Sequence, residues 1–139
     1  MGLPHPHAIT AKLVHPNRKV LAITGDAGFM MNCQECETAH RLGTNFVTLI
    51  FNDRSYGLIK WKQDMQYGHH EYVDFTNPDF VKFAESMGAA GYRIEKTEDL
   101  LPTLIKAFKQ DKPVIIDCPV DYSENMKLTH HPEELMKEL

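Results

Sequence analysis

The sequence predicts an α/β fold in which helices cover both faces of a parallel β-sheet. Three compact apolar runs predict buried strands: Lys19–Thr24, Asn45–Phe51 and Pro113–Val120. Segments rich in helix-forming residues lie between these runs, and strands that alternate with helices of this length favour parallel pairing through crossovers. A chain of 139 residues can bury its own core, so we expect a single domain over residues 1–139.

The remaining elements follow from local signals. Ala8–Val14 predicts a short helix, and Gly28–Leu42 predicts a longer one that Gly43 caps. The later elements are, in order, a short helix over Ser55–Gln66, an irregular loop over Tyr67–Pro78, a helix opened by Asn77-Pro78-Asp79 that ends at Met87, a strand over Gly91–Ile94, a helix with Thr97 as its N-cap, and a terminal helix over Pro132–Leu139.

Composition and charge argue against several classes of protein. Hydrophobic residues make up 42% and charged residues 24% of the chain, and the formal net charge is −4. This balance lacks the basic surface of a nucleic-acid-binding protein, so we expect no nucleic-acid partner. No apolar run approaches the roughly 20 residues of a membrane helix, and residues 1–7 lack the features of a signal peptide. With three cysteines in the chain, the expected location is the cytoplasm.

Two acidic residues follow the first two predicted strands. Asp26 lies two residues beyond the first strand and Asp53 two residues beyond the second, 53 − 26 = 27 residues apart. This separation fits one strand–helix–strand crossover, and the carboxyl ends of such strands form the edge where parallel sheets bind ligands. Two carboxylates in one crevice repel each other unless a cation lies between them. Oxygen ligands without nearby histidine or cysteine favour Mg²⁺ or Ca²⁺ over zinc.

Small residues lead from Asp26 into the following helix. Gly25, Ala27 and Gly28 allow a phosphate to approach the backbone, and the start of a helix offers free N–H groups. Proteins usually hold Mg²⁺ with one or two carboxylates together with substrate phosphates. The pattern therefore predicts a metal-bridged diphosphate. The alternative interpretation is an ordinary turn at Gly25-Asp26, with Asp53 as a helix N-cap.

These residues resemble the signature of the thiamine-diphosphate-dependent enzymes, Gly-Asp-Gly followed one crossover later by Asn-Asn. In this sequence it reads Gly25-Asp26-Ala27 and Asn52-Asp53. From about Ala11 to its end the chain is similar to the acetolactate synthases, especially the catabolic, FAD-independent type. The segments that carry this similarity are Gly28-Phe-Met-Met31, Glu37-Thr-Ala-His-Arg-Leu42, Phe51-Asn-Asp-Arg-Ser-Tyr-Gly57 and Pro119-Val-Asp-Tyr-Ser-Glu-Asn125.

The resemblance implies a thiamine-diphosphate-binding fold with thiamine diphosphate and Mg²⁺ as cofactors. Asp26 and Asp53 would bind the metal through their side chains, and Ser55 would bind it through its backbone carbonyl. The diphosphate would contact backbone N–H groups of two residues, Ala27 and Gly28. The turn that closes over the cofactor would be lined by three residues, Tyr56, Gly57 and Leu58.

Three positions depart from the family pattern. Ala27 replaces the third signature glycine, a small-for-small change that still permits close approach. Asp53 replaces the second asparagine and adds a negative charge, which should tighten metal binding. Lys62 stands where anabolic acetolactate synthases usually carry a substrate-pocket tryptophan, which weighs against the anabolic type. The neighbouring Trp61 is either a pocket wall or the apolar face of a short helix.

The resemblance covers the C-terminal cofactor-binding domain of a longer multidomain enzyme. We expect truncation at the N-terminal end, because His5-Pro6-His7 interrupts a family motif that Gly2-Leu-Pro4 begins. The complete enzyme would decarboxylate pyruvate and condense it with a second pyruvate to give 2-acetolactate. Family members receive an activating glutamate from another domain of a partner subunit. We therefore expect a homo-oligomer, no catalytic residue in this chain and no activity of the chain alone.

Several alternatives remain open at this stage. Within the family, the domain would belong instead to a pyruvate oxidase or another 2-keto-acid decarboxylase. Outside it, a non-catalytic magnesium-binding module of flavodoxin or receiver type would also use an acidic crevice. Cys33 and Cys36 form a C-x-x-C pattern for which buried or semi-exposed helix positions are favoured over a redox or zinc site. His69-His70 is favoured as a solvated loop over a substrate contact, and Asp117 is expected in a surface or capping role.

Overall fold

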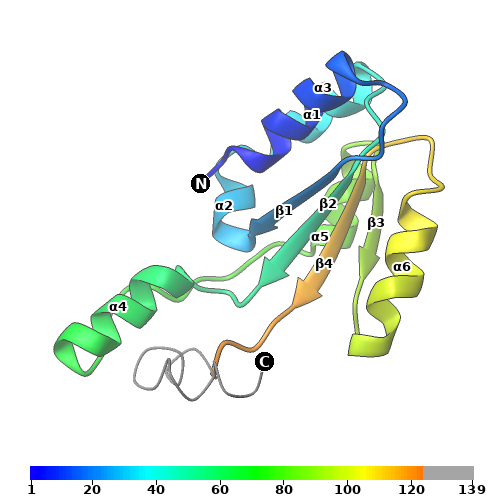
Figure 1. The fold of residues 1–139 in the computed structure, drawn as a ribbon. Coiled ribbons are helices and arrows are strands. Elements are labelled where there is room, and N and C mark those ends of the chain that lie inside the picture. Colours follow the sequence, from blue (N-terminus) through cyan, green and yellow to red (C-terminus); the bar gives the residue numbers. More distant parts are fainter. Residues whose placement is uncertain (124–139) are drawn as a thin grey trace, which may run out of the picture.

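Four parallel strands form the sheet of this chain, in the order β1-β2-β4-β3 (Figure 1). The coordinates are a computed structural model that describes residues 1–123. The predicted helix over residues 132–139 lies outside the described part. The elements are α1 (Pro4–Val14), β1 (Leu21–Gly25), α2 (Asp26–Met30), α3 (Glu35–Arg41), β2 (Val47–Asn52), α4 (Gly57–Tyr67), α5 (Phe80–Ser86), β3 (Ala90–Arg93), the 3₁₀ helix η1 (Thr97–Asp99), α6 (Leu100–Ala107) and β4 (Val114–Pro119).

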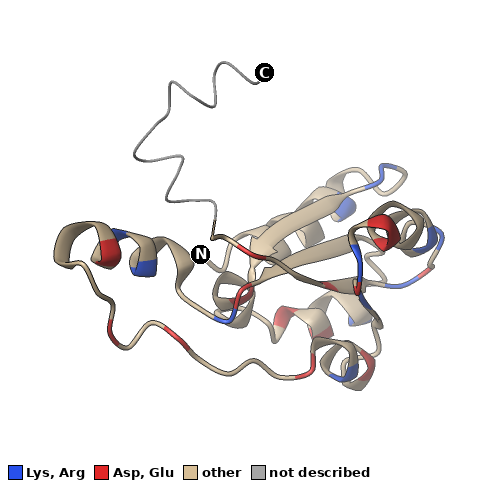
Figure 2. Cartoon of the chain, turned by 90° about the horizontal axis from the view of Figure 1, so that it is seen from below, with Lys and Arg blue, Asp and Glu red and all other residues tan. Residues whose placement is uncertain are grey.

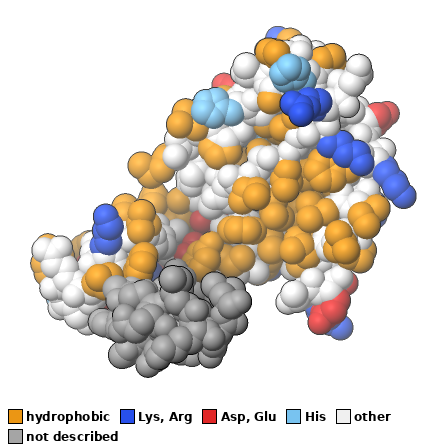
Figure 3. Space-filling view, in the orientation of Figure 1, with side chains coloured by type: hydrophobic (Ala, Val, Ile, Leu, Met, Phe, Trp, Pro, Cys, Tyr) orange, Lys and Arg blue, Asp and Glu red, His pale blue; other side chains and the backbone are white. Residues whose placement is uncertain are grey.

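Helices cover both faces of the sheet, as the sequence predicts, but they do so unequally. On one face, α1, α2, α3 and α5 pack over the sheet around Phe29, Ile50 and Ile115. On the other face, α6 packs against side chains of β2, β3 and β4. The outer side chains of β1 stay uncovered there, with Leu21 40% and Ile23 52% exposed. Figure 3 shows a broad hydrophobic surface on the side of the molecule that faces the viewer.

Burial explains why the apolar runs of the strands are more continuous in β2 and β4 than in β1. The central strands β2 and β4 are buried along almost their whole length, so they consist of nearly continuous apolar runs. The edge strand β1 alternates between exposed and buried positions. Gly25 pairs with Phe51, and Asn52 pairs with Pro119. The carboxyl ends of β1, β2 and β4 are therefore aligned at one edge of the sheet.

The single helix predicted over residues 28–42 is wrong, because the structure contains α2 and α3 with a turn between them. In the turn, the backbone N–H groups of Asn32 and Glu35 donate to carbonyls three residues back, those of Phe29 and Asn32. The Asn32 side chain also donates to the Gly2 carbonyl at 2.9 Å. The break therefore anchors the N-terminal residues, a contact between distant parts of the chain that local sequence signals do not contain.

The two predicted helix starts near Asp79 and Thr97 have opposite outcomes. Asp79 is the N-cap of α5, and its side chain accepts from the N–H groups of Val81 and Lys82. Thr97 as an N-cap is wrong, because it lies in η1, and α6 begins only at Leu100. Pro102 explains the late start. Proline has no N–H to donate and is tolerated only in the first turn of a helix.

Helix α4 projects away from the sheet in both ribbon views (Figures 1 and 2). None of its residues is buried. The irregular segment after it returns to the sheet edge, where the Tyr56 N–H donates to the Val73 carbonyl and the Phe75 N–H to the Arg54 carbonyl. Figure 2 shows acidic and basic residues interspersed along the chain. Within residues 1–123, no helix is both long enough and apolar enough to cross a membrane.

Candidate functional site

Asp26 and Asp53 lie at the same edge of the sheet, as their spacing predicts. Each residue directly follows its strand, and β1 and β2 are neighbours in parallel register. The charges of both carboxylates also affect the same tyrosine side chain, Tyr122. The pKa of Tyr122 is raised first by burial and then by the negative charges of Asp53 and Asp26. The two acidic side chains therefore share one local environment.

The Asp26 carboxylate is 1% exposed and accepts three hydrogen bonds. Its Oδ1 accepts from the Ala27 N–H at 2.8 Å, and its Oδ2 accepts from the Arg54 N–H at 2.8 Å and from Asn77 Nδ2 at 2.6 Å. An ionised carboxylate has about four acceptor positions, so one remains. Among residues 1–123, no lysine, arginine or histidine forms an ion pair with Asp26. Because buried charges are normally paired or coordinate a metal, this carboxylate fits a cation.

Asp53 and Ser55 supply further oxygen atoms at the same edge. Asp53 is half-buried and accepts from the N–H of Ser55 at 3.2 Å and from its hydroxyl at 2.8 Å. These two bonds leave acceptor positions on the Asp53 carboxylate. Within the described chain, no backbone N–H donates to the Ser55 carbonyl. Two carboxylates and a carbonyl are the hard oxygen ligands that Mg²⁺ prefers.

Arg54 connects the ends of β1 and β2 through an unusual backbone conformation. Its φ of 56° lies in the left-handed region, which costs a residue with a side chain roughly 1–2 kcal/mol. Its N–H donates to the buried Asp26 carboxylate. This charge-assisted hydrogen bond holds the turn after β2 against the end of β1.

Two hollows flank the acidic edge. One of about 440 Å³ is lined by Asp53, Ser55, Gly57, Trp61 and the residues that follow β4. Trp61 is therefore a pocket wall. The other hollow, of about 300 Å³, has a lining that includes three residues near the edge, Ala27, Tyr56 and Asn77.

The remaining predicted contact residues lie at different distances from the edge. Gly25 is the last residue of β1, and Gly28 lies in α2, where a Cβ would stand 3.1 Å from the Thr24 hydroxyl. Leu58 is 62% exposed on α4 and lines neither hollow. Of the predicted cofactor contacts, Ala27, Tyr56 and Gly57 thus line the hollows beside the edge, whereas Leu58 is largely exposed to solvent.

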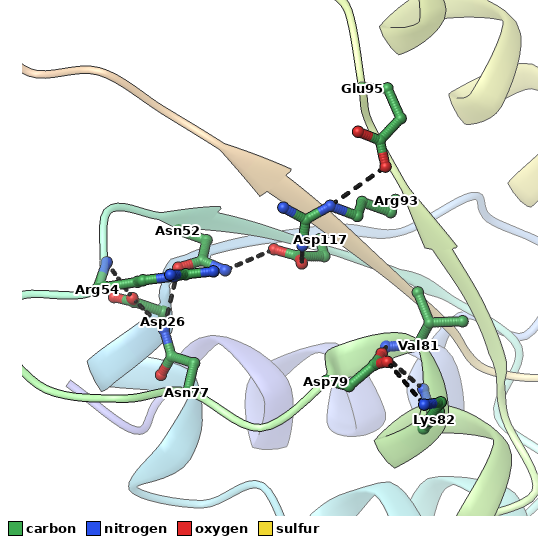
Figure 4. A network of polar contacts seen from close by, with 10 residues as sticks. All are labelled: Asp26, Asn52, Arg54, Asn77, Asp79, Val81, Lys82, Arg93, Glu95 and Asp117. Carbon is green, nitrogen blue, oxygen red and sulfur yellow. Dashed lines mark hydrogen bonds and ion pairs between the residues drawn. The ribbon is translucent and has the colours of Figure 1, made fainter.

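A polar network behind Asp26 was not predicted from the sequence (Figure 4). Asn77 Nδ2 lies 2.9 Å from Asn52 Oδ1, and Asn52 Nδ2 lies 2.8 Å from Asp117 Oδ1. Asp117 Oδ2 accepts from Arg93 Nη1 at 2.6 Å. The predicted surface or capping role of Asp117 is wrong, since it is 2% exposed inside β4. A charged residue within an otherwise apolar strand was the available signal.

The C-x-x-C pattern and the paired histidines have structural explanations. Cys36 is fully buried, and its pKa is raised to about 12, chiefly by burial and then by Cys33 and Glu35. No group of three His, Cys, Asp or Glu side chains in residues 1–123 is arranged to hold a metal. His69 is exposed in a loop, and His70 lies 2.7 Å from Asp64. The predicted helix position is confirmed for Cys36, which lies in α3, and is wrong for Cys33, which lies in the turn before α3. The exposed His69 agrees with the predicted solvated loop, whereas His70 is half-buried.

Comparison with known proteins relates most of the chain to one enzyme family. The family described as "Thiamine pyrophosphate enzyme, C-terminal TPP binding domain" matches residues 1–118. An acetolactate synthase of Bacillus subtilis is 43% identical over 92% of the chain, and a catabolic acetolactate synthase of Raoultella terrigena is 40% identical over 90%. The chain spans about a fifth of each relative, 22% in both cases.

A solved structure shares the fold. The thiamine diphosphate-dependent 4-hydroxybenzoylformate decarboxylase of Rhodococcus jostii RHA1 superposes with a TM-score of 0.82 at 26% identity. The superposition covers 89% of this chain and 24% of the decarboxylase.

Proposed function

Because the chain belongs to the thiamine pyrophosphate enzymes, as their C-terminal TPP-binding domain, we propose that it anchors thiamine diphosphate through a Mg²⁺ ion. The metal ligands are Asp26, Asp53 and the backbone carbonyl of Ser55. The observation that carries this proposal is the buried Asp26 carboxylate, which has three N–H donors, one free acceptor position and no cationic partner within residues 1–123.

The backbone around this edge contributes the phosphate contacts. Gly25 and Gly28 leave room for close approach, and Gly28 offers an N–H in the first turn of α2. The N–H of Ala27 already donates to Asp26, so it supports the metal ligand as well as facing the phosphate. Tyr56 and Gly57 form the turn over the cofactor, with Leu58 at its outer side.

We propose that the whole protein makes 2-acetolactate from two molecules of pyruvate. The support is the identity of 40–43% to acetolactate synthases over most of the chain. Thiamine diphosphate supplies the electron sink for decarboxylation when bound. The residues of this chain bind and orient it, while a partner subunit supplies the activating glutamate in a homo-oligomer. The isolated chain is inactive, and its free cysteines fit the reducing cytoplasm.

A second candidate within the family is a 2-keto-acid decarboxylase, favoured by the fold of the 4-hydroxybenzoylformate decarboxylase. Pyruvate oxidase is a third member of the same group. The flavodoxin or receiver alternative is not supported, because those folds have the strand order 2-1-3-4-5, whereas this sheet has β1-β2-β4-β3.

A chimera tests the proposed activity. This chain replaces the matching segment of the Bacillus subtilis acetolactate synthase, and the products formed from pyruvate are identified. We expect 2-acetolactate, and we expect its loss in an Asp26→Ala chimera. A folded chimera that releases acetaldehyde, or that forms no product with bound cofactor, would contradict the assignment. Acetolactate formation by the isolated chain would contradict the proposed need for a second domain.

A further inference from the structure

We propose that Asn77, together with the buried Asp117 and its partly exposed partner Arg93, positions the Asp26 carboxylate for metal binding. The proposal rests on the proposed function, because it assigns a purpose to the orientation of Asp26. Asn77 positions Asp26 by direct contact, whereas Asp117 acts on Asp26 through Asn52 and Asn77.

The contacts form one continuous path through the sheet edge (Figure 4). Asn77 Nδ2 donates to Asp26 Oδ2 at 2.6 Å and to Asn52 Oδ1 at 2.9 Å. Asn52 Nδ2 donates to Asp117 Oδ1 at 2.8 Å. The path thus joins the end of β1, the end of β2, the interior of β4 and the segment before α5. Three of its side chains, Asp26, Asn52 and Asp117, are buried.

The two carboxylates determine how both amides are oriented. Asp117 can only accept, so Asn52 turns its NH₂ group toward it and its carbonyl toward Asn77. Asn77 then faces two acceptors, Asn52 Oδ1 and Asp26 Oδ2, and can satisfy both only with its NH₂ group. Arg93 fixes the far end, because it donates to Asp117 Oδ2 at 2.6 Å. The orientation of the Asn77 amide toward Asp26 therefore depends on the whole series of contacts that begins at Arg93.

Asn77 serves this arrangement at the expense of its own hydrogen bonding. Its Oδ1 is buried and has no partner within residues 1–123. A buried acceptor without a partner is unfavourable and rare in folded proteins. A side chain selected for stability alone would satisfy this atom, whereas a side chain that must present two donors to Asp26 and Asn52 leaves it unsatisfied.

The first test needs no ligand. The Arg54 N–H donates to the same Asp26 Oδ2 that accepts from Asn77, so hydrogen exchange at Arg54, measured by NMR, reports whether Asp26 is held. We expect exchange at the Arg54 N–H to accelerate about tenfold in Asn77→Ala. Without Asn77 the Asp26 carboxylate is held less firmly, so its hydrogen bond from the Arg54 N–H is weakened. Asn32→Ala is the matched control, since it removes another half-buried asparagine that bonds a distant residue.

The distal end of the path is tested with Asp117→Asn. Asp117 accepts from Asn52 Nδ2 and from Arg93 Nη1, one donor on each carboxylate oxygen. The asparagine side chain has one oxygen in place of two, so it can accept from only one of these donors in the same geometry. Arg93→Gln is the second variant if Asp117→Asn does not fold, because Arg93 is partly exposed. Faster Arg54 exchange with unchanged exchange in the middle of β2 supports the proposal. Unchanged Arg54 exchange in Asn77→Ala overturns it.

The second test measures metal affinity at saturating thiamine diphosphate. Trp61 is the only tryptophan and lines the hollow beside Asp53, so its fluorescence follows a Mg²⁺ titration. We expect Asn77→Ala to raise the half-saturating Mg²⁺ concentration roughly 10- to 100-fold with the same final signal. If Asn77 only stabilised the fold, Asn77→Ala would lower the final fluorescence change without moving the midpoint of the Mg²⁺ titration. If the wild-type chain shows no Mg²⁺ response, the proposed function fails and the metal-binding purpose of Asn77 fails with it, while Arg54 exchange still decides whether Asn77 holds the Asp26 side chain.

Discussion

The Asp53 carboxylate lies directly against the backbone of Gly57, so that a Cβ at position 57 would stand 2.6 Å from Asp53 Oδ2. Gly57 is the first residue of α4, and Asp53 directly follows β2. The start of the projecting helix and the second acidic residue of the site are therefore packed together, and a side chain at residue 57 would displace the Asp53 carboxylate.

Gly57→Ala should weaken Mg²⁺-dependent binding of thiamine diphosphate by roughly tenfold or more. The added methyl group displaces Asp53 from Ser55, although alanine itself favours a helix over glycine by about 0.5–1 kcal/mol. Calorimetric titration measures the effect. Gln66→Ala, at an exposed position of the same helix, should bind like the wild type. Equal affinities of Gly57→Ala and Gln66→Ala would show that Asp53 is not a ligand.

Acidification should destabilise the fold through His5. Its ring is 3% exposed, lies 3.0 Å from the Thr48 hydroxyl and packs edge-on against Phe29 and Phe46. Burial lowers the pKa of His5 from 6.5 to about 4, while Glu35 opposes the shift. The unfolded chain binds this proton near pH 6.5 and the folded chain only near pH 4. The free energy of unfolding should therefore fall as the pH decreases through this range, by about 3 kcal/mol in total.

Urea unfolding at several pH values between about 7 and 4 measures this loss. His5→Leu should remove most of the slope, because leucine does not titrate. His15→Gln, at an exposed position, should retain the slope of the wild type. A His5→Leu slope equal to that of the wild type would assign the acid sensitivity to other groups.

Alkylation should distinguish the two cysteines of the C-x-x-C pattern. Cys36 is fully buried with a pKa raised to about 12, whereas Cys33 is partly exposed. Because the thiolate is the nucleophile, iodoacetamide should label Cys33 in the native chain well before Cys36. Both should react in denaturant. Mass spectrometry of tryptic peptides reads the order, and preferential labelling of Cys36 would indicate a reactive site after all.

Two isoleucines on opposite faces of the sheet should differ in their contribution to stability. Ile50 is fully buried beneath the helices of one face, so Ile50→Ala should cost about 2–5 kcal/mol. Ile23 is 52% exposed on the other face, so Ile23→Ala should cost less than about 1 kcal/mol. Urea denaturation compares them. Equal costs would mean that Ile23 is covered in solution.

The parts of the fold that follow from local patterns were predictable. Continuous apolar runs gave the central strands, and Asp26 and Asp53 could be placed at one edge because parallel strands end together. The late start of α6 could also have been predicted, because Pro102 would lie beyond the first turn of a helix that began at Thr97.

Other features depend on contacts between distant residues. The break between α2 and α3 involves Asn32 and the Gly2 carbonyl, 30 residues apart. Arg93 meets Asp117 only because β3 pairs with β4 in that register, and Asn77 meets Asp26 only after the loop beyond α4 returns to the sheet. None of these pairings has a periodic or local signal in the sequence.

Binding of thiamine diphosphate to the purified chain, measured by calorimetry with Mg²⁺ and with EDTA, shows whether the chain anchors the cofactor through a metal ion. We expect weak binding with Mg²⁺, because the purified chain provides only part of the cofactor's contacts, and we expect its loss with EDTA or in a folded Asp26→Asn variant. Binding that is equal with and without Mg²⁺, or that persists unchanged in Asp26→Asn, would contradict anchoring through a metal ion.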